Sequence, residues 1–137
     1  MAKGDDIRNL LVDFTVEIMD LCDALRKKPG MGPIPDQLMR CGTSPGPNYA
    51  EARGAESARD FVHKLGIALK ELNESEHWLE VLIKRKMAED QPVEKTLEDC
   101  KKLCRIIGAS VRTAKKNLGR YPMAKPGEEK PPPIPDG

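Results

Sequence analysis

Aromatic side chains and long apolar runs are scarce in this sequence. Its 137 residues include one Trp, two Tyr and two Phe, although hydrophobic residues make up 39% of the chain. The core must therefore be built mainly from Leu, Ile, Val, Ala and Met, and this composition favours helices over sheets. No apolar run approaches the roughly 20 residues of a membrane-crossing helix, and the start, MAKGDD, has no hydrophobic signal core. We therefore expect a cytoplasmic protein with no membrane partner.

A strong net charge is also missing. The chain has 23 Lys and Arg against 22 Asp and Glu, a net charge of +1. The whole molecule is not a polycation, so any case for nucleic-acid binding must rest on how the charges are distributed. Nothing in the sequence indicates an oxidising compartment, and we expect reduced thiols at all four cysteines: Cys22, Cys41, Cys100 and Cys104.

Helical periodicity is the dominant pattern. Apolar residues recur at three- and four-residue steps within residues 7–25, 57–87 and 92–119, which predicts three amphipathic helices. Asp5 and Asp6 supply a cap and negative charge at the start of the first, and Gly30 with its preceding proline ends it. Ser57 followed by Asp60 resembles a capping box at the start of the 57–87 helix.

Residues 40–52, RCGTSPGPNYAEA, interrupt this regularity with prolines, glycines and polar residues. The composition suits a loop, a kinked helix or a site. A helix capped by Asp36 would enter this stretch, where Pro45 and Pro47 each remove an N–H group and push the preceding residue away from helical angles. Since helical spacing resumes after Asn48, we predict a second helix that is kinked.

Four helical segments with short connectors predict an all-α, antiparallel up-down four-helix bundle, because each apolar stripe can be buried only against the others. We assign residues 1–119 to this bundle. Residues 120–137 are rich in Pro, Gly and charge and are predicted to be a disordered, flexible tail.

The last predicted helix carries the strongest chemical signal. No acidic residue occurs between Lys101 and Arg120. Helical spacing puts most of the cations of this stretch near one face, which would neutralise phosphates and would do so more strongly in a ring of subunits. A solvated face near a helix C-terminus is an equally good interpretation. The candidate nucleic-acid-binding residues are Lys101, Lys102, Arg105, Arg112, Lys115, Lys116 and Arg120.

The central sequence, QLMRCGTSPGPNYAEA followed by DFVHKLGIALKELNESEHWLEVL, resembles the four-helix-bundle proteins encoded within 23S ribosomal RNA intervening sequences. The resemblance covers most of residues 7–112, and Pro45 and Pro47 depart from it because one proline is familiar there and two are not. It implies a homopentameric ring without catalysis. Accessory proteins of diversity-generating retroelements share the fold group and bind a reverse transcriptase and nucleic acid. The family pattern falls on Gln37, Arg40, Ser44, Asn48, Ala50, Glu51, Phe61, Lys64, Leu65, Lys70, Glu71, Trp78 and Leu79.

These observations predict a non-enzymatic, oligomeric bundle that binds RNA, or a complex of reverse transcriptase and RNA, through its basic surface. The alternative is a structural scaffold without a nucleic-acid role. Beside the main stripe, the 57–87 helix carries Val62, Ile67 and Val81, which suggests apolar surface for assembly. The candidate subunit-interface residues are Arg40, Asn48, Glu51 and Trp78.

Catalytic and metal sites find little support in the sequence. His63 and His77 lie on one helix, whereas a dinuclear site needs ligands on facing helices. Cys100 and Cys104 fit small core residues better than a zinc site, and Ser44 has no nucleophile-elbow pattern. We expect no enzyme activity, cofactor, metal or small-molecule substrate, and a metal-binding bundle is the weakest of the three readings.

Overall fold

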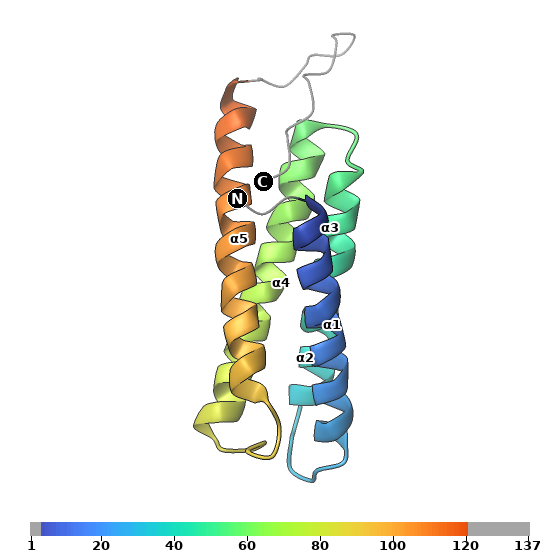
Figure 1. The fold of residues 1–137 in the computed structure, drawn as a ribbon, viewed down its shortest axis with the longest axis vertical. Helices are drawn as coiled ribbons and strands as arrows, with labels where there is room; N and C mark the ends of the chain where they lie inside the picture. The colour runs from blue at the N-terminus through green and yellow to red at the C-terminus, as the bar shows by residue number, and fades with distance from the viewer. Residues whose placement is uncertain (1–3, 121–137) are drawn as a thin grey trace.

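The computed structural model describes residues 4–120, and every regular element in that range is a helix (Figure 1). The elements are α1 (Gly4–Arg26), α2 (Ile34–Thr43), α3 (Pro45–Arg53), α4 (Ala58–Lys84) and α5 (Val93–Arg120). Because α2 and α3 follow end to end with a bend of 17°, they form one arm of a four-helix bundle. The all-α bundle with a kinked second helix is confirmed. The predicted tail lies outside the described residues, apart from Arg120.

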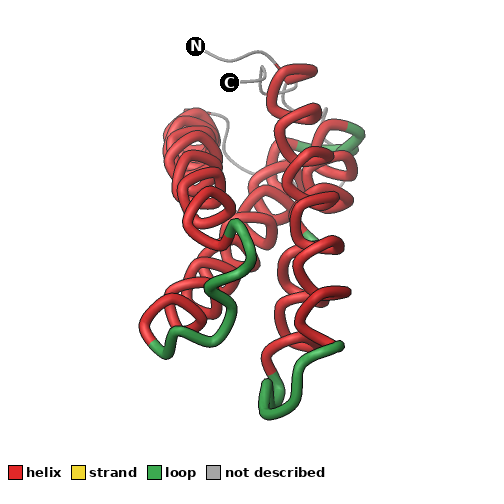
Figure 2. Tube along the Cα trace, turned by 60° about the horizontal axis from the view of Figure 1, so that its bottom comes forward, coloured by secondary structure: helices red, strands yellow, loops and turns green. Residues whose placement is uncertain are grey.

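Each helix of the bundle packs beside two neighbours and lies diagonally opposite the third. α1 packs beside α5 and beside the α2–α3 arm, and α4 packs beside the same two neighbours. Within the described range, no close backbone contact joins α1 to α4 or α5 to the arm, so each of these pairs lies across a diagonal. The α1–α2 and α4–α5 connections lie together at one end of the bundle (Figures 1 and 2). Successive helices therefore run in opposite directions, and neighbouring helices are antiparallel, as predicted.

The helix boundaries show which local signals act. Asp5 and Asp6 lie in the first turn of α1, and Gly30 adopts a φ of 77° in the loop that follows this helix. The Ser57 side chain accepts a hydrogen bond of 3.0 Å from the Asp60 backbone N–H, so the predicted cap of α4 is confirmed. Asp36 does not cap the next helix, because α2 begins at Ile34 with Pro33 at its N-cap position.

The start of α2 therefore corrects the predicted cap. Pro35 lies inside the first turn, where a missing N–H group costs nothing because no intrahelical acceptor is available there. The Pro33 cap position makes no side-chain hydrogen bond. The prolines of this connector start the helix where we expected them to delay it.

The kink is supported by side chains on either side of Ser44. The Ser44 backbone keeps helical angles (φ −81°, ψ −35°), and Pro45 begins α3. The Asn48 amide donates to the Ser44 carbonyl at 3.0 Å and to its hydroxyl at 2.9 Å, and Thr43 donates to the Met39 carbonyl. Pro45 and Pro47 leave the carbonyls four residues before them, those of Cys41 and Thr43, without a helical N–H donor. The side-chain bonds add links on both sides of this gap, and the arm bends without unfolding.

One close approach fixes α1 against this arm. A Cβ atom at Gly42 would lie 2.7 Å from Cγ2 and 2.8 Å from Cγ1 of Ile18. Ile18 is fully buried, and the absence of a side chain at Gly42 lets α1 and α2 meet at this point. The core on the inner side of these helices is aliphatic, as expected, with Phe14 its largest fully buried side chain.

Candidate nucleic-acid interface

The candidate interface lies on α5, whose two halves differ in charge. Its first turns contain Glu94, Glu98 and Asp99 as well as Lys95, whereas all charged residues from Lys101 onward are basic. The opposite side of the helix is buried in the core, where it contributes Leu103, Ile107, Val111 and Ala114. Because the apolar side is fixed inward, the cations are directed outward.

The structure describes the side chains of six of the predicted cations, and it brings most of them to one solvent-facing side. Among the six, Lys101 is half-buried and the other five are exposed. Within residues 4–120, none of these six cations forms an ion pair. Arg120 is the last described residue. The six cations are Lys101, Lys102, Arg105, Arg112, Lys115 and Lys116.

Five of them share a narrow sector of the helix, which we call the basic face: Lys101, Arg105, Arg112, Lys115 and Lys116. Their positions extend over about 22 Å of helix at the usual rise per residue. The guanidinium of Arg112 folds back toward Gly108, with Nη1 3.5 Å from where a Cβ at Gly108 would be. A row of exposed cations without internal acidic partners suits contact with a polyanion.

Lys102 belongs to a different environment. It lines a cleft of about 220 Å³ between α1 and α5, together with Asp13, Glu17 and Asp99. Lys95 Nζ lies 3.0 Å from Glu17 Oε1 and 2.7 Å from Asp99 Oδ2. Burial and the neighbouring Asp99 carboxyl raise the pKa of Glu17, against the opposing effect of Lys95. Lys102 therefore faces an acidic cleft, and we separate it from the basic face.

Two of the predicted interface residues meet in a polar network between α2 and α4. Arg40 Nη1 lies 2.9 Å from Glu71 Oε2, and Nη2 pairs with Glu74. The Trp78 indole N–H donates to the same Glu74 carboxylate at 3.1 Å, and its ring lies edge-on to His77. The Arg40 guanidinium, aided by Trp78, holds the pKa of Glu74 below its ordinary value although partial burial opposes the shift. Arg40 and Trp78 thus tie two helices of one chain together.

The other two predicted interface residues are also occupied within the chain. Asn48 bonds to Ser44 at the kink, and Glu51 Oε1 lies 3.3 Å from Lys64 Nζ of α4. Val62 and Val81 are partly buried and pack against the core. A role of these residues in subunit contacts stays a prediction.

The thiols behave as core residues. Cys22, Cys41 and Cys100 are buried and Cys104 is half-buried, all without a disulfide. Cys41 Sγ accepts from the Ser75 hydroxyl at 3.3 Å. Burial raises the pKa of Cys22 and of Cys41 to about 11, which keeps both protonated at neutral pH. Among residues 4–120, no three His, Cys, Asp or Glu side chains gather in a way that would hold a metal ion.

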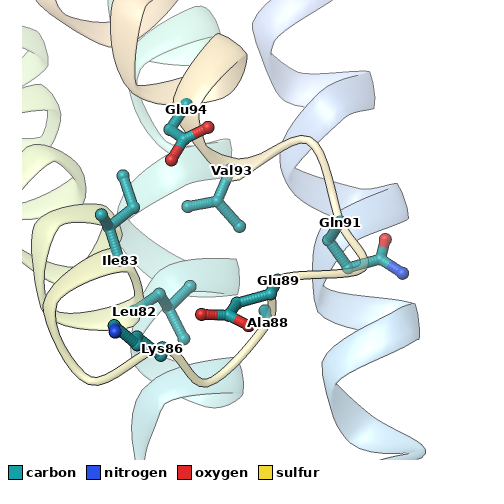
Figure 3. A pocket seen from close by; sticks show the side chains of 8 residues that line it. All are labelled: Leu82, Ile83, Lys86, Ala88, Glu89, Gln91, Val93 and Glu94. Carbon is teal, nitrogen blue, oxygen red and sulfur yellow. The ribbon is translucent and has the colours of Figure 1, made fainter.

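A larger cavity, of about 360 Å³, lies at the turn between α4 and α5 (Figure 3). Its walls combine aliphatic side chains such as Leu82 and Val93 with Lys86, Glu89 and Glu94. The sticks in Figure 3 come from the ends of both helices and from their connection, and no Ser, Thr, Cys or His is among them. The cavity offers no evident chemistry beyond mixed charge.

Sequence reasoning missed one surface. Val12, Val16 and Met19 of α1 are 46%, 52% and 47% exposed, and they are the large hydrophobic residues that the described chain leaves open to solvent. They are spaced by four and three residues, so a second apolar stripe was present in the sequence. It was hidden because the buried stripe of α1 follows the same period one step away.

The geometry defines a class of protein: a four-helix bundle with a one-sided cationic surface and, in the described range, no helix long and apolar enough to cross a membrane. Residues 6–109 match the sequence profile of the 23S rRNA-intervening sequence proteins, and the chain belongs to this family. A similar crystal structure is that of a protein of unknown function from the S23 ribosomal protein family of Bacteroides thetaiotaomicron. It shares 34% identity and a TM-score of 0.71, over 82% of this chain and 100% of that chain. No curated protein matches.

Proposed function

We propose that this protein binds RNA, alone or within a complex with a reverse transcriptase, through the basic face of α5, and that it has no catalytic role. The single observation that carries the proposal is the row of five outward cations without acidic partners in the described chain. Membership of the 23S rRNA-intervening sequence family supports a link to RNA. We place this activity in the cytoplasm.

The chemistry of the basic face limits how such binding works. No aromatic side chain lies between Lys101 and Lys116, so bases have no stacking platform there. Lys and Arg contacts to phosphates are largely independent of sequence and release counterions. The proposed contact is therefore directed at the RNA backbone and weakens steeply as salt concentration rises.

Assembly is the second part of the proposal. We expect a homo-oligomer, and the family resemblance suggests a pentameric ring, in which Arg40, Asn48, Glu51 and Trp78 take part in subunit contacts. A ring would present the basic face once per copy and raise the effective number of phosphate contacts. The exposed Val12, Val16 and Met19 favour the rival function, a scaffold whose main property is association with protein.

Charge reversal tests the proposal. The variant Arg112→Glu/Lys115→Glu/Lys116→Glu should lose salt-sensitive RNA, measured as nucleic-acid absorbance that copurifies at low salt and as binding of a labelled single-stranded RNA. The matched control reverses three exposed cations at the ends of α4, Arg59 and Lys84 within the helix and Arg85 at its C-cap, and makes the same change in net charge. Equal loss in both variants would reduce the effect to overall charge, and wild-type protein that binds no RNA at low salt would favour the scaffold.

A further inference from the structure

The outward side of α1 carries an ordered pattern, which we call the α1 seam. Its residues follow one another at three- and four-residue steps, so they lie along one line of the helix. The described side chains of the seam are all exposed, and its middle is apolar while both ends are charged. The seam consists of Asp5, Arg8, Val12, Val16, Met19, Asp23 and Arg26.

The charges of the seam are opposite at mirror positions. When a second α1 is laid alongside in the opposite direction, Arg8 faces Asp23 and Asp5 faces Arg26, while Val12 faces Met19 and Val16 lies at the centre. Laid in the same direction, each charge would meet a like charge. Self-complementarity of this kind is what a two-fold contact between identical subunits requires.

The four charged residues of the seam differ in whether they have an ionic partner within the chain. Asp5 pairs with Arg53 and Arg26 pairs with Asp36 inside the chain. By contrast, within residues 4–120 the Asp23 side chain makes no hydrogen bond or ion pair, and the Arg8 side chain donates only to its neighbour Asn9, at 3.4 Å. Of the two kinds of charge pair that would form across the two-fold axis, Arg8–Asp23 is thus the one whose members have no ionic partner within the described chain.

From this pattern we infer that two copies of the chain associate through an antiparallel contact between their α1 seams, with Val16 at the centre and Arg8–Asp23 ion pairs on both sides. The inference concerns assembly and so rests on that part of the proposed function, but not on RNA binding. Such an isologous contact joins copies in pairs and cannot alone close a five-membered ring. It therefore adds a contact to those of a ring, and it uses no residue of the basic face of α5.

The particle mass in solution tests the apolar centre. Val16→Glu should halve the mass measured by light scattering at micromolar concentration, since it places two like charges together at the axis. Val16 is half exposed, so an unchanged helical circular dichroism spectrum is expected. A wild-type protein that is monomeric, or a Val16→Glu variant whose mass equals that of the wild type, would overturn the inference.

Charge exchange tests the geometry. Arg8→Asp and Asp23→Arg should each weaken association, whereas the double variant R8D/D23R should recover it, because the ion pair is re-formed with its partners exchanged. Mixing the two single variants should give a hybrid particle for the same reason. Arg59→Asp on α4 is the control, an equal charge change at an exposed position outside the seam. Failure of the double variant to recover association would exclude antiparallel pairing, whatever the result for RNA binding.

Discussion

The outward faces of α1 and α5 lie on neighbouring helices of one bundle, yet they suit different partners. On α1, an apolar centre lies between charges of both signs in mirror order, a pattern that suits contact with another protein surface. On α5, the charges have one sign and the apolar residues face the core, as suits a flexible polyanion. A net charge of +1 therefore hides two different surfaces, a cationic one on α5 and one of mixed charge with an apolar centre on α1.

The largest expected effect separates these two faces directly. Arg112→Glu/Lys115→Glu/Lys116→Glu should weaken RNA binding by about 100-fold or more at low salt, because three favourable phosphate contacts become repulsive. Its particle mass should stay that of the wild type. Val16→Glu should show the reverse behaviour, with halved mass and RNA affinity per chain near that of the wild type. If one variant alters both properties, the faces are not independent.

A second prediction concerns how α1 is held in place. Gly42→Ala should destabilise the protein by about 1–3 kcal/mol through overpacking, since the new Cβ atom would lie 2.7 Å from Ile18 Cγ2. Thermal or urea unfolding measures this change. Gly66→Ala in α4 is the matched control, because apart from its chain neighbours and its own helix backbone no atom lies within 4 Å of its Cβ position. It should stabilise by up to about 1 kcal/mol, as alanine usually does within a helix.

A third, smaller effect tests the limits of the basic face. Arg112→Ala should weaken RNA binding about 3- to 10-fold by removing one phosphate contact. Lys102→Ala should change affinity less, because Lys102 faces the acidic cleft between α1 and α5. Fluorescence anisotropy with one labelled RNA compares the two variants. A Lys102→Ala loss equal to that of Arg112→Ala would extend the RNA contact into the cleft.

The smallest effect lies in the cleft where the two helices meet. Because burial beside Asp99 raises the pKa of Glu17 above its ordinary 4.5, the ionised form is disfavoured in the folded protein. The stability that protonated Glu17 contributes is therefore fully present below pH 4.5 and is lost as the pH rises through the higher folded-state pKa. Glu17→Gln should stabilise at neutral pH by a few tenths of a kcal/mol. This gain should vanish at acidic pH, and unfolding curves at both pH values measure it.

The parts of the fold that follow from periodicity were predictable. The stripes that contain Ile7, Leu72 and Ile107 repeat at helical spacing, and all three residues are buried. The kink was predictable because Pro45 and Pro47 remove N–H groups. The start of α2 was not, since Pro35 is compatible both with a loop and with a first helical turn. Thr43 and Asn48 each bond to the carbonyl four residues earlier, and spacing alone does not show which polar side chains fold back in this way.

The candidate sites divide in the same way. Spacing along one helix was enough to group Arg105, Arg112 and Lys116 on a face, and the structure places them there. Spacing was insufficient for Lys102, because its cleft is lined by Glu17 of α1 as well as by Asp99 of its own helix. The α1 seam was missed because exposure depends on where the neighbouring helices leave a gap, and one helix period cannot reveal that.

The central claim is that the basic face of α5 binds RNA through phosphates, and a salt titration tests it most directly. The dissociation constant of the wild-type protein for a labelled single-stranded RNA would be measured over a range of salt concentrations. We expect a linear fall of log affinity with log salt, with a slope of up to about −3.5 if all five cations contact phosphates, and a much flatter slope for Arg112→Glu/Lys115→Glu/Lys116→Glu. An affinity independent of salt, or equal slopes for both proteins, would contradict it.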